Sequence, residues 1–297
     1  MYLLILAILP GILLLWYFRR KDHANPEPSR YIWITLLISA VFVIPVALIE
    51  VGLTALTGLS ETGNARNVFL YALLVIALIE EISKALAVRI YAYRKIEFNE
   101  PIDGLLYGAA SGAGFAILEN IFYVMEHGLA VAIMRAFLSV PMHVFTGALM
   151  GYGLLRLKLH ASYSRFAILF TLSVLLHGIY DFVIFTMTVA SPGIAIGISV
   201  GAVLLLFGVT RYYVHKYQTV VGDETPKPSV IKKFLWRITG IMVLLASAFM
   251  ALGAMVNYAE GKKDDMAVYA VLIFLPAAFG IYCLIRSRRY RPTIITT

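Results

Sequence analysis

Long apolar runs separated by short polar segments dominate the chain. Each run has about the length needed to cross a bilayer, because roughly 20 helical residues at ~1.5 Å each span the hydrocarbon core. The pattern therefore predicts an all-α fold, a polytopic transmembrane helix bundle of about nine spans. The predicted spans are Tyr2–Phe18, Tyr31–Leu56, Val68–Ala92, Asp103–Met125, Leu129–Leu155, Phe166–Ala190, Ile194–Val214, Ile238–Tyr258 and Ala267–Ile285.

Composition and charge support a membrane protein and argue against a nucleic-acid-binding protein. Hydrophobic residues make up 61% of the 297 positions and charged residues only 14%, which is more apolar than a soluble core of this size needs. The net charge is +8, but most Lys and Arg fall in loops on one predicted side of the membrane. By the positive-inside rule, the N-terminus is expected outside and the C-terminus in the cytoplasm. We expect a multi-pass protein of the plasma membrane that is embedded in the lipid bilayer and does not bind nucleic acid.

Residues 1–297 are predicted to form one integral membrane domain. Ionisable side chains at membrane depth gather in the third to sixth runs, so the motif-bearing catalytic core is placed at about residues 68–190. The peripheral spans, within 1–57 and 194–285, carry few such groups. Charge inside a bilayer costs roughly 2.5–3.5 kcal/mol per residue at the helix centre, so a cluster of it indicates function.

The third run carries two adjacent carboxylates, Glu80 and Glu81, near its middle. Lys84 follows at the four- and three-residue spacings that place side chains on one helix face. A single ammonium neutralises one carboxylate more easily than two. The surplus carboxylate therefore needs a polar cavity, a proton or another partner.

The next three runs offer such partners. The fourth contains Glu119 and Asn120, the fifth His143, and the sixth His177 and Asp181. A carboxylate in low dielectric can act as general base and then acid, and histidines can hold a water or stabilise an oxyanion, so the set suits hydrolysis. His177 and Asp181 also have the four-residue spacing of helical metal sites, and with His143 and a glutamate they are candidates for a zinc site.

Other interpretations of these residues remain open. A Glu pair beside a Lys is sometimes only a structural ion pair, and a membrane histidine often only bridges helices. The same carboxylates also suit a proton- or ion-coupled transporter, although the sequence shows no internal repeat typical of transporters. A non-catalytic membrane scaffold is the third alternative, and the retained Glu pair and histidines argue against it.

Four motifs in these runs resemble the PrsW family of intramembrane proteases, within the superfamily of CAAX-prenyl and bacteriocin-processing endopeptidases. The motifs are Glu80-Glu81-x-x-Lys84, Phe115-x-x-x-Glu119-Asn120, Pro141-x-His143 with Gly147, and His177-x-x-x-Asp181. The wider superfamily has His where this chain has Glu119, and His-x-x-x-Asn where it has His143 and Gly147. The pattern therefore resembles the PrsW branch, and a CAAX substrate is not expected.

The resemblance implies an intramembrane endopeptidase of glutamic or metallo type that cleaves a single-pass membrane protein. An anti-sigma factor, cut on the outer side in the first step of regulated proteolysis, is one such substrate. The implied catalytic residues are Glu80, Glu81, Glu119, His143 and His177, and the supporting residues are Lys84, Asn120 and Asp181. Candidate ligands for a metal are Glu81, Glu119, His143 and His177, with zinc the candidate ion. Oligomeric state, cleavage site and choice between metal and glutamate chemistry stay open.

Overall fold

The computed structural model describes residues 2–186, 192–220, 278, 281–282 and 284–285. The all-α prediction is confirmed there, because the regular structure of these residues is entirely helical. The elements are α1 (Tyr2–Lys21), α2 (Ser29–Thr57), α3 (Ala65–Leu70), η1 (Tyr71–Ala77), α4 (Leu78–Ile90), η2 (Ala92–Arg94), α5 (Pro101–Phe137), α6 (Ser139–His160), α7 (Tyr163–Phe185) and α8 (Pro192–Val220). The eighth predicted span and all but a few residues of the ninth lie outside the described residues.

Four helical segments among the described residues are long and apolar enough to cross a membrane. They are Tyr2–Lys21, Ser29–Thr57, Pro101–His160 and Tyr163–Phe185. The segment Pro101–His160 contains two helices, α5 and α6, and corresponds to two predicted spans. The full count of nine spans and the orientation of both termini stay predictions.

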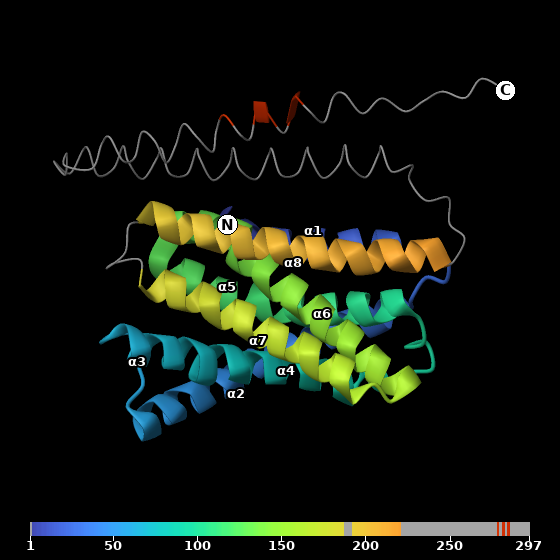
Figure 1. Cartoon of the computed structure of the whole chain (residues 1–297), viewed down its shortest axis with the longest axis horizontal. Coiled ribbons are helices and arrows are strands. Elements are labelled where there is room, and N and C mark those ends of the chain that lie inside the picture. The colour runs from blue at the N-terminus through green and yellow to red at the C-terminus, as the bar shows by residue number, and fades with distance from the viewer. Residues whose placement is uncertain (1, 187–191, 221–277, 279–280, 283, 286–297) are drawn as a thin grey trace. The chain divides into compact units, whose positions relative to one another are not determined.

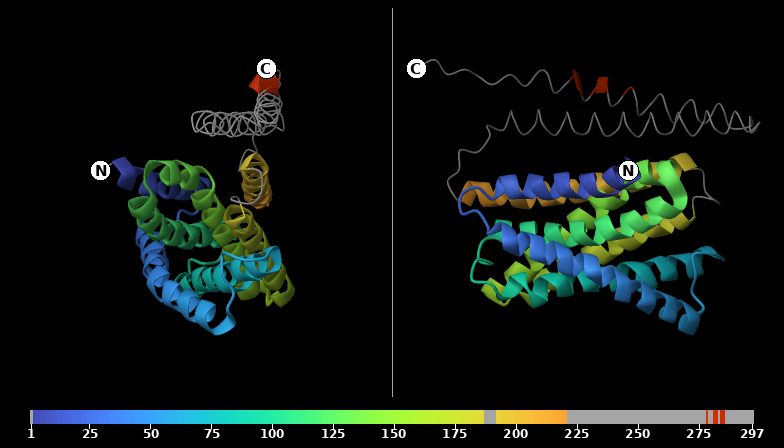
Figure 2. Two further views of the ribbon diagram at one scale, coloured as in Figure 1. Left: turned by 90° about the vertical axis from the view of Figure 1, so that its left-hand side faces the viewer. Right: turned by 180° about the vertical axis from the view of Figure 1, so that it is seen from behind.

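Most described residues belong to one compact unit, within Met1–Thr188 and Gly201–Tyr217. In this unit α5 and α6 pack against each other, α1 and α2 pack on α5, and α7 packs on α6 and η1. Figure 1 and Figure 2 show the long helices of the unit running along a roughly common direction. A second unit comprises Val189–Val200 and Gln218–Thr297, most of it outside the described residues, so the prediction of a single domain stays untested.

The third predicted span is a continuous helical stretch with a π-helix in its middle. α3, η1 and α4 follow one another without a break, since the joining residues Leu70 and Ala77 both have right-handed helical backbone angles. The π-helix of Tyr71–Ala77 ends three residues before Glu80. Such wide turns change which side chains a helix presents downstream, and they are frequent at functional sites. The sequence pattern did not predict it.

Helices α5 and α6 form an antiparallel hairpin, which is the arrangement that the short turn Glu126-His127-Gly128 between the fourth and fifth predicted spans favours. The chain turns at Gly128, whose φ of 78° and ψ of −156° are not helical. Arg135 returns to within 2.7 Å of Glu119, whereas 16 residues of straight helix would span roughly 24 Å. The fifth predicted span differs in being broken at Leu138, with φ −117° and ψ −63°. The break has a local cause, because Pro141 has no N–H to donate to the carbonyl four residues earlier and its ring would clash there.

Glycines allow the two helices of the hairpin to touch along their backbones. A Cβ added to Gly108 would lie 2.2 Å from the carbonyl oxygen of Gly147, and one on Gly112 would lie 2.1 Å from that of His143. No side chain fits at such distances. Close backbone contact at Gly112 therefore fixes how far His143 stands from α5, which links the packing of the hairpin to the polar centre.

Gly108→Ala is expected to destabilise the protein by about 1–3 kcal/mol, because the methyl group must push the two backbones apart. The measurement is the free energy of unfolding in detergent micelles. Gly52→Ala is the matched control, since a Cβ at Gly52 would have nothing within 4 Å. A Gly108→Ala protein as stable as Gly52→Ala would contradict the close packing described here.

Buried carboxyl groups occupy the linker between α1 and α2. Glu27 is 4% exposed, and its carboxylate accepts a hydrogen bond from the hydroxyl of Tyr107 in α5. The backbone N–H of Glu27 donates to Asp22 Oδ2 at 2.8 Å. Burial raises the pKa of Glu27 to about 7, with the negative charge of Asp22 acting in the same direction. The linker is thus held against α5 by an acid that favours its neutral form.

We expect the stability of the protein to fall as pH rises from about 4.5 through about 7, because the folded state holds the Glu27 proton more tightly than the unfolded state. The contribution is fully present below the ordinary pKa of 4.5 and is lost above about 7. Glu27→Gln, which is neutral at every pH, should lower the slope of melting temperature against pH. Glu126→Gln, at a side chain that is 76% exposed, should leave the slope unchanged. Equal slopes for the two variants would contradict this account.

Candidate active site

Glu80 and Glu81 lie in the first turn of α4, immediately after the π-helix. Their exposed fractions are 4% and 0%, so both carboxyl groups are removed from solvent. Adjacent residues on a helix point in directions about 100° apart. The two carboxylates accordingly meet different neighbours, and the structure separates their roles.

Lys84 pairs chiefly with Glu81. Its ammonium is fully buried and lies 2.8 Å from Glu81 Oε1 and 3.6 Å from Glu80 Oε2. It also donates to Nδ1 of His143 at 2.8 Å. The spacing argument, which allowed one strong pair, agrees with these distances. Glu80 remains without a full counter-charge from its own helix.

His177 of α7 is held between carboxylates on its two ring nitrogens. Nδ1 donates to Glu81 Oε1 at 2.9 Å, and Nε2 lies 3.2 Å from Asp181 Oδ2. The same Nε2 lies 3.7 Å from Glu80 Oε2. A nitrogen that faces two carboxylates requires a proton or a metal ion between them.

His143 of α6 also has a carboxylate near each of its two ring nitrogens. Nδ1 lies 3.5 Å from Glu80 Oε2, and Nε2 lies 2.9 Å from Glu119 Oε2. Glu119 is in turn held by Arg135, 2.7 Å away. Arg135 Nε donates to the side chain of Asn120 at 2.9 Å, and Asn120 donates to the carbonyl oxygen of Ala7 at 3.2 Å. Asn120 therefore positions Arg135 and connects this network to α1.

Glu80, His143 and His177 converge on one point between helices α4, α6 and α7. One donor atom from each residue lies within 4.8 Å of the other two, and all three residues are buried. The separations from Glu80 Oε2, 3.5 Å and 3.7 Å, are long for hydrogen bonds. They are close to the roughly 3.4 Å expected between ligands of a tetrahedral ion with bonds of about 2.0–2.1 Å. Glu80 Oε2 is also buried without a hydrogen-bond partner, so the donor set fits a metal ion.

Each histidine of this candidate metal site also contacts side chains outside the donor set. His177 contacts Glu81 with Nδ1, and its Nε2 faces both Glu80 and Asp181. His143 contacts Glu119 with Nε2, and its Nδ1 faces Glu80 and accepts from Lys84. Carboxylates in that place fix the tautomer and ring orientation of ligating histidines. The structure therefore favours Glu80 as a ligand, whereas the sequence analysis proposed Glu81 and Glu119. Glu81 and Glu119 instead contact the other ring nitrogens of His177 and His143.

Three further residues of the site were not assigned from the sequence. Thr146 donates to Glu81 Oε1 at 2.9 Å, and its place three residues after His143 is the only signal for it. Arg135 pairs with Glu119, and its place as a charge inside the fifth predicted span is the signal that could have indicated it. Glu50 of α2 lies within electrostatic range of Glu80, Glu119 and Asp181, and its Oε1 is buried without a hydrogen-bond partner. A charge in the second apolar run was the only hint of Glu50.

Comparisons with known proteins match a part of the chain that includes the motif-bearing region. The sequence profile described as "PrsW family intramembrane metalloprotease" matches residues 27–210. Protease PrsW of Geobacillus kaustophilus is 35% identical over 180 residues, which are 60% of this chain and 77% of the relative. Protease PrsW of Bacillus subtilis is 35% identical over 182 residues, and that of Oceanobacillus iheyensis is 33% identical over 180; each match covers 60% of this chain and 80% of the relative. No solved structure matches the chain.

Proposed function

Because this chain belongs to the PrsW family of intramembrane metalloproteases and is a membrane peptide hydrolase, we propose that Glu80, His143 and His177 hold a zinc ion at its active centre. The observation that carries the proposal is the convergence of these three donors on one buried point. When bound, the ion supplies Lewis-acid polarisation of the scissile carbonyl and of a water molecule. The protein's own side chains supply orientation and proton transfer.

Glu81 serves as a fixed anion in this proposal. Its Oε1 accepts hydrogen bonds from Lys84, Thr146 and His177, all at 2.8–2.9 Å. A carboxylate engaged three times on one oxygen is poorly placed to move protons. It holds the His177 ring in orientation instead. With an ion held by His143, Lys84 would lose the His143 nitrogen as an acceptor and would keep Glu81 as its partner.

Proton transfer is assigned to Glu119 and Asp181. They are the two carboxylates next to the histidines whose side chains remain partly exposed, at 16% and 13%. A general base must reach the water it deprotonates and later return the proton to the leaving amine. Arg135 beside Glu119 supplies a positive charge that can stabilise the negative charge that develops on the oxyanion.

The proposed substrate is a single-pass protein anchored in the same membrane. A site buried among helices at membrane depth is accessible to a transmembrane or juxtamembrane segment more readily than to a soluble protein. An anti-sigma factor, cut on the outer side of the plasma membrane, is the substrate class that the family resemblance suggests. The enzyme itself would be a multi-pass protein of that membrane.

Cleavage of a single-pass reporter in reconstituted vesicles tests the proposal. Wild type should cut the reporter, His177→Ala should not, and His127→Ala should behave as wild type because its side chain is 46% exposed on the hairpin turn. Circular dichroism shows whether each variant stays helical. Equal cleavage by wild type and a folded His177→Ala protein would refute the proposed centre. Ion flux without cleavage by wild type would instead favour a transporter.

A further inference from the structure

A polar hollow lies at the turn between α6 and α7, away from the active centre. Its volume is about 630 Å³, and it is lined by Arg156, His160, Ala161, Ser162, Tyr163, Ser164 and Arg165. The turn connects two helical segments that are each long and apolar enough to cross a membrane. The hollow therefore lies at a membrane boundary, the depth at which lipid phosphate groups are found.

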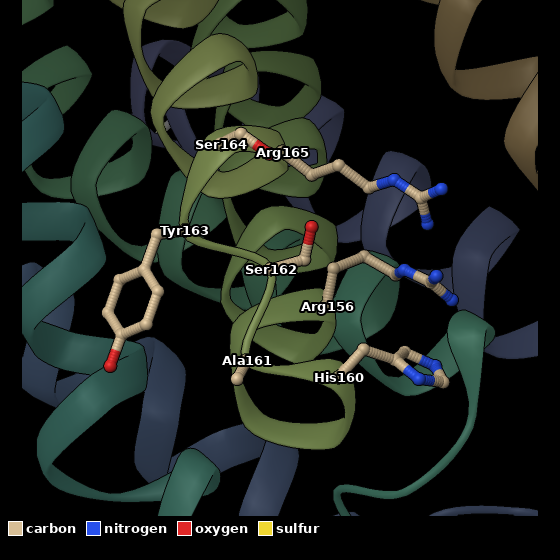
Figure 3. Close-up of a pocket in the computed structure, with 7 residues that line it drawn as sticks. All are labelled: Arg156, His160, Ala161, Ser162, Tyr163, Ser164 and Arg165. Carbon is tan, nitrogen blue, oxygen red and sulfur yellow. The ribbon is translucent and has the colours of Figure 1, made fainter.

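Three basic side chains meet at one side of this turn. Figure 3 shows Arg156, His160 and Arg165 pointing in the same direction, whereas Tyr163 points the opposite way. Arg156 is half-buried, and its Nε is a buried donor without a hydrogen-bond partner. A guanidinium with a free donor beside a second guanidinium is an arrangement that suits an oxyanion.

The start of α7 forms one wall of the hollow and has no side-chain cap. Ser162 is the N-cap residue, but its side chain accepts no capping hydrogen bond, and the first turn contains no acidic residue. Arg165 stands instead in that first turn, where a positive charge opposes the helix dipole. Backbone N–H groups at a helix start can bind anions, and Ser164 and Arg165 of this first turn line the hollow.

The sequence offers no carboxylate to balance these charges nearby. Residues 127–180 contain neither Asp nor Glu. The residues that line the hollow thus include two guanidinium groups, an imidazole and three hydroxyl groups, and none of them is a carboxylate. The lining is therefore positively charged, although Glu97 and Asp103 lie within electrostatic range of Lys158 near the end of α6.

We propose that this hollow is a binding site for a phosphate group, held by Arg156, Arg165 and the N-terminal turn of α7. A phosphate presents several charged oxygens, which match two guanidinium forks together with hydroxyl and backbone donors. The headgroup of an anionic phospholipid and a soluble phosphate both have this chemistry. Binding would attach the α6–α7 turn to the membrane boundary, and α6 carries His143 while α7 carries His177.

The test uses the full chain in neutral detergent, stripped of lipid. Thermal unfolding is followed in inorganic phosphate and in chloride at equal ionic strength, and separately in micelles containing phosphatidylglycerol or phosphatidylcholine. The variant is Arg156→Gln/Arg165→Gln. The control is Arg30→Gln/Arg94→Gln, which removes the same charge outside the hollow. Each protein is compared with its own melting temperature in chloride.

Phosphate should raise the melting temperature of wild type and control by a few degrees, and the apparent affinity for phosphate should fall at least about tenfold in Arg156→Gln/Arg165→Gln. Stabilisation by phosphatidylglycerol that inorganic phosphate competes away would identify a lipid headgroup. Stabilisation by inorganic phosphate alone would identify a soluble phosphate. The proposal is overturned if wild type responds to neither phosphate nor phosphatidylglycerol, or if the variant and the control respond equally.

Discussion

Glu80→Gln is expected to reduce cleavage of a membrane-anchored reporter by about 100- to 10,000-fold while leaving the helical fold intact. Glu80 Oε2 lies 3.5 Å from Nδ1 of His143 and 3.7 Å from Nε2 of His177. A neutral amide is a poor metal ligand and cannot supply the negative charge that the centre needs. Its shape is almost unchanged, so the loss should be one of chemistry and not of packing.

The measurement is the rate of reporter cleavage in vesicles at matched protein concentration. Glu126→Gln is the matched control, since this substitution makes the same chemical change at a side chain that is 76% exposed. If Glu80→Gln retained more than about a tenth of the activity, Glu80 would not be a central ligand. Loss of activity with Glu81→Gln and not Glu80→Gln would return the ligand role to Glu81.

Lys84→Met is expected to destabilise the metal-free protein by about 3–5 kcal/mol, the second large effect. The ammonium is fully buried, lies 2.8 Å from Glu81 Oε1 and donates to His143 Nδ1. Removing it leaves the buried charge of Glu81 with no cation of its own helix. Met fills a similar volume, so the cost reports the lost charge more than a cavity.

A double-mutant cycle separates the pair from other effects. The free energy of unfolding is measured after chelation for Lys84→Met, Glu81→Gln and the double variant. The double variant should be more stable than the sum of the two single losses predicts, because it leaves no unpaired charge. Strict additivity would show that Lys84 and Glu81 act independently, against the geometry.

The sequence predicted which residues gather, because depth along each helix can be counted. Glu80, Glu81, His143 and His177 all fall near the middle of their runs, and the structure brings their side chains into contact. The α5–α6 hairpin was equally predictable, because only the short segment Glu126-His127-Gly128 separates the fourth and fifth predicted spans. Their catalytic roles remain proposals.

The sequence could not predict which glutamate faces the two histidines. Adjacent residues on one helix differ by about 100° in direction, and the π-helix just before α4 resets that direction. Nothing in the sequence of Tyr71–Ala77 indicates a π-helix, because its formation depends on tertiary packing. The break at Leu138 was not predicted either, because a proline in a helix is compatible with a kink as well as with a new helix start.

Zinc content of the purified protein tests the central claim most directly. Elemental analysis is carried out on wild type, His177→Ala and His127→Ala after identical purification in detergent. We expect about one zinc ion per chain in wild type and in His127→Ala, and less than about a tenth of that in His177→Ala. Of the two substituted histidines, His177 belongs to the converging donor set and His127 does not. Wild-type protein that cleaves its substrate while holding no stoichiometric metal would contradict the account and leave the glutamates as the catalysts.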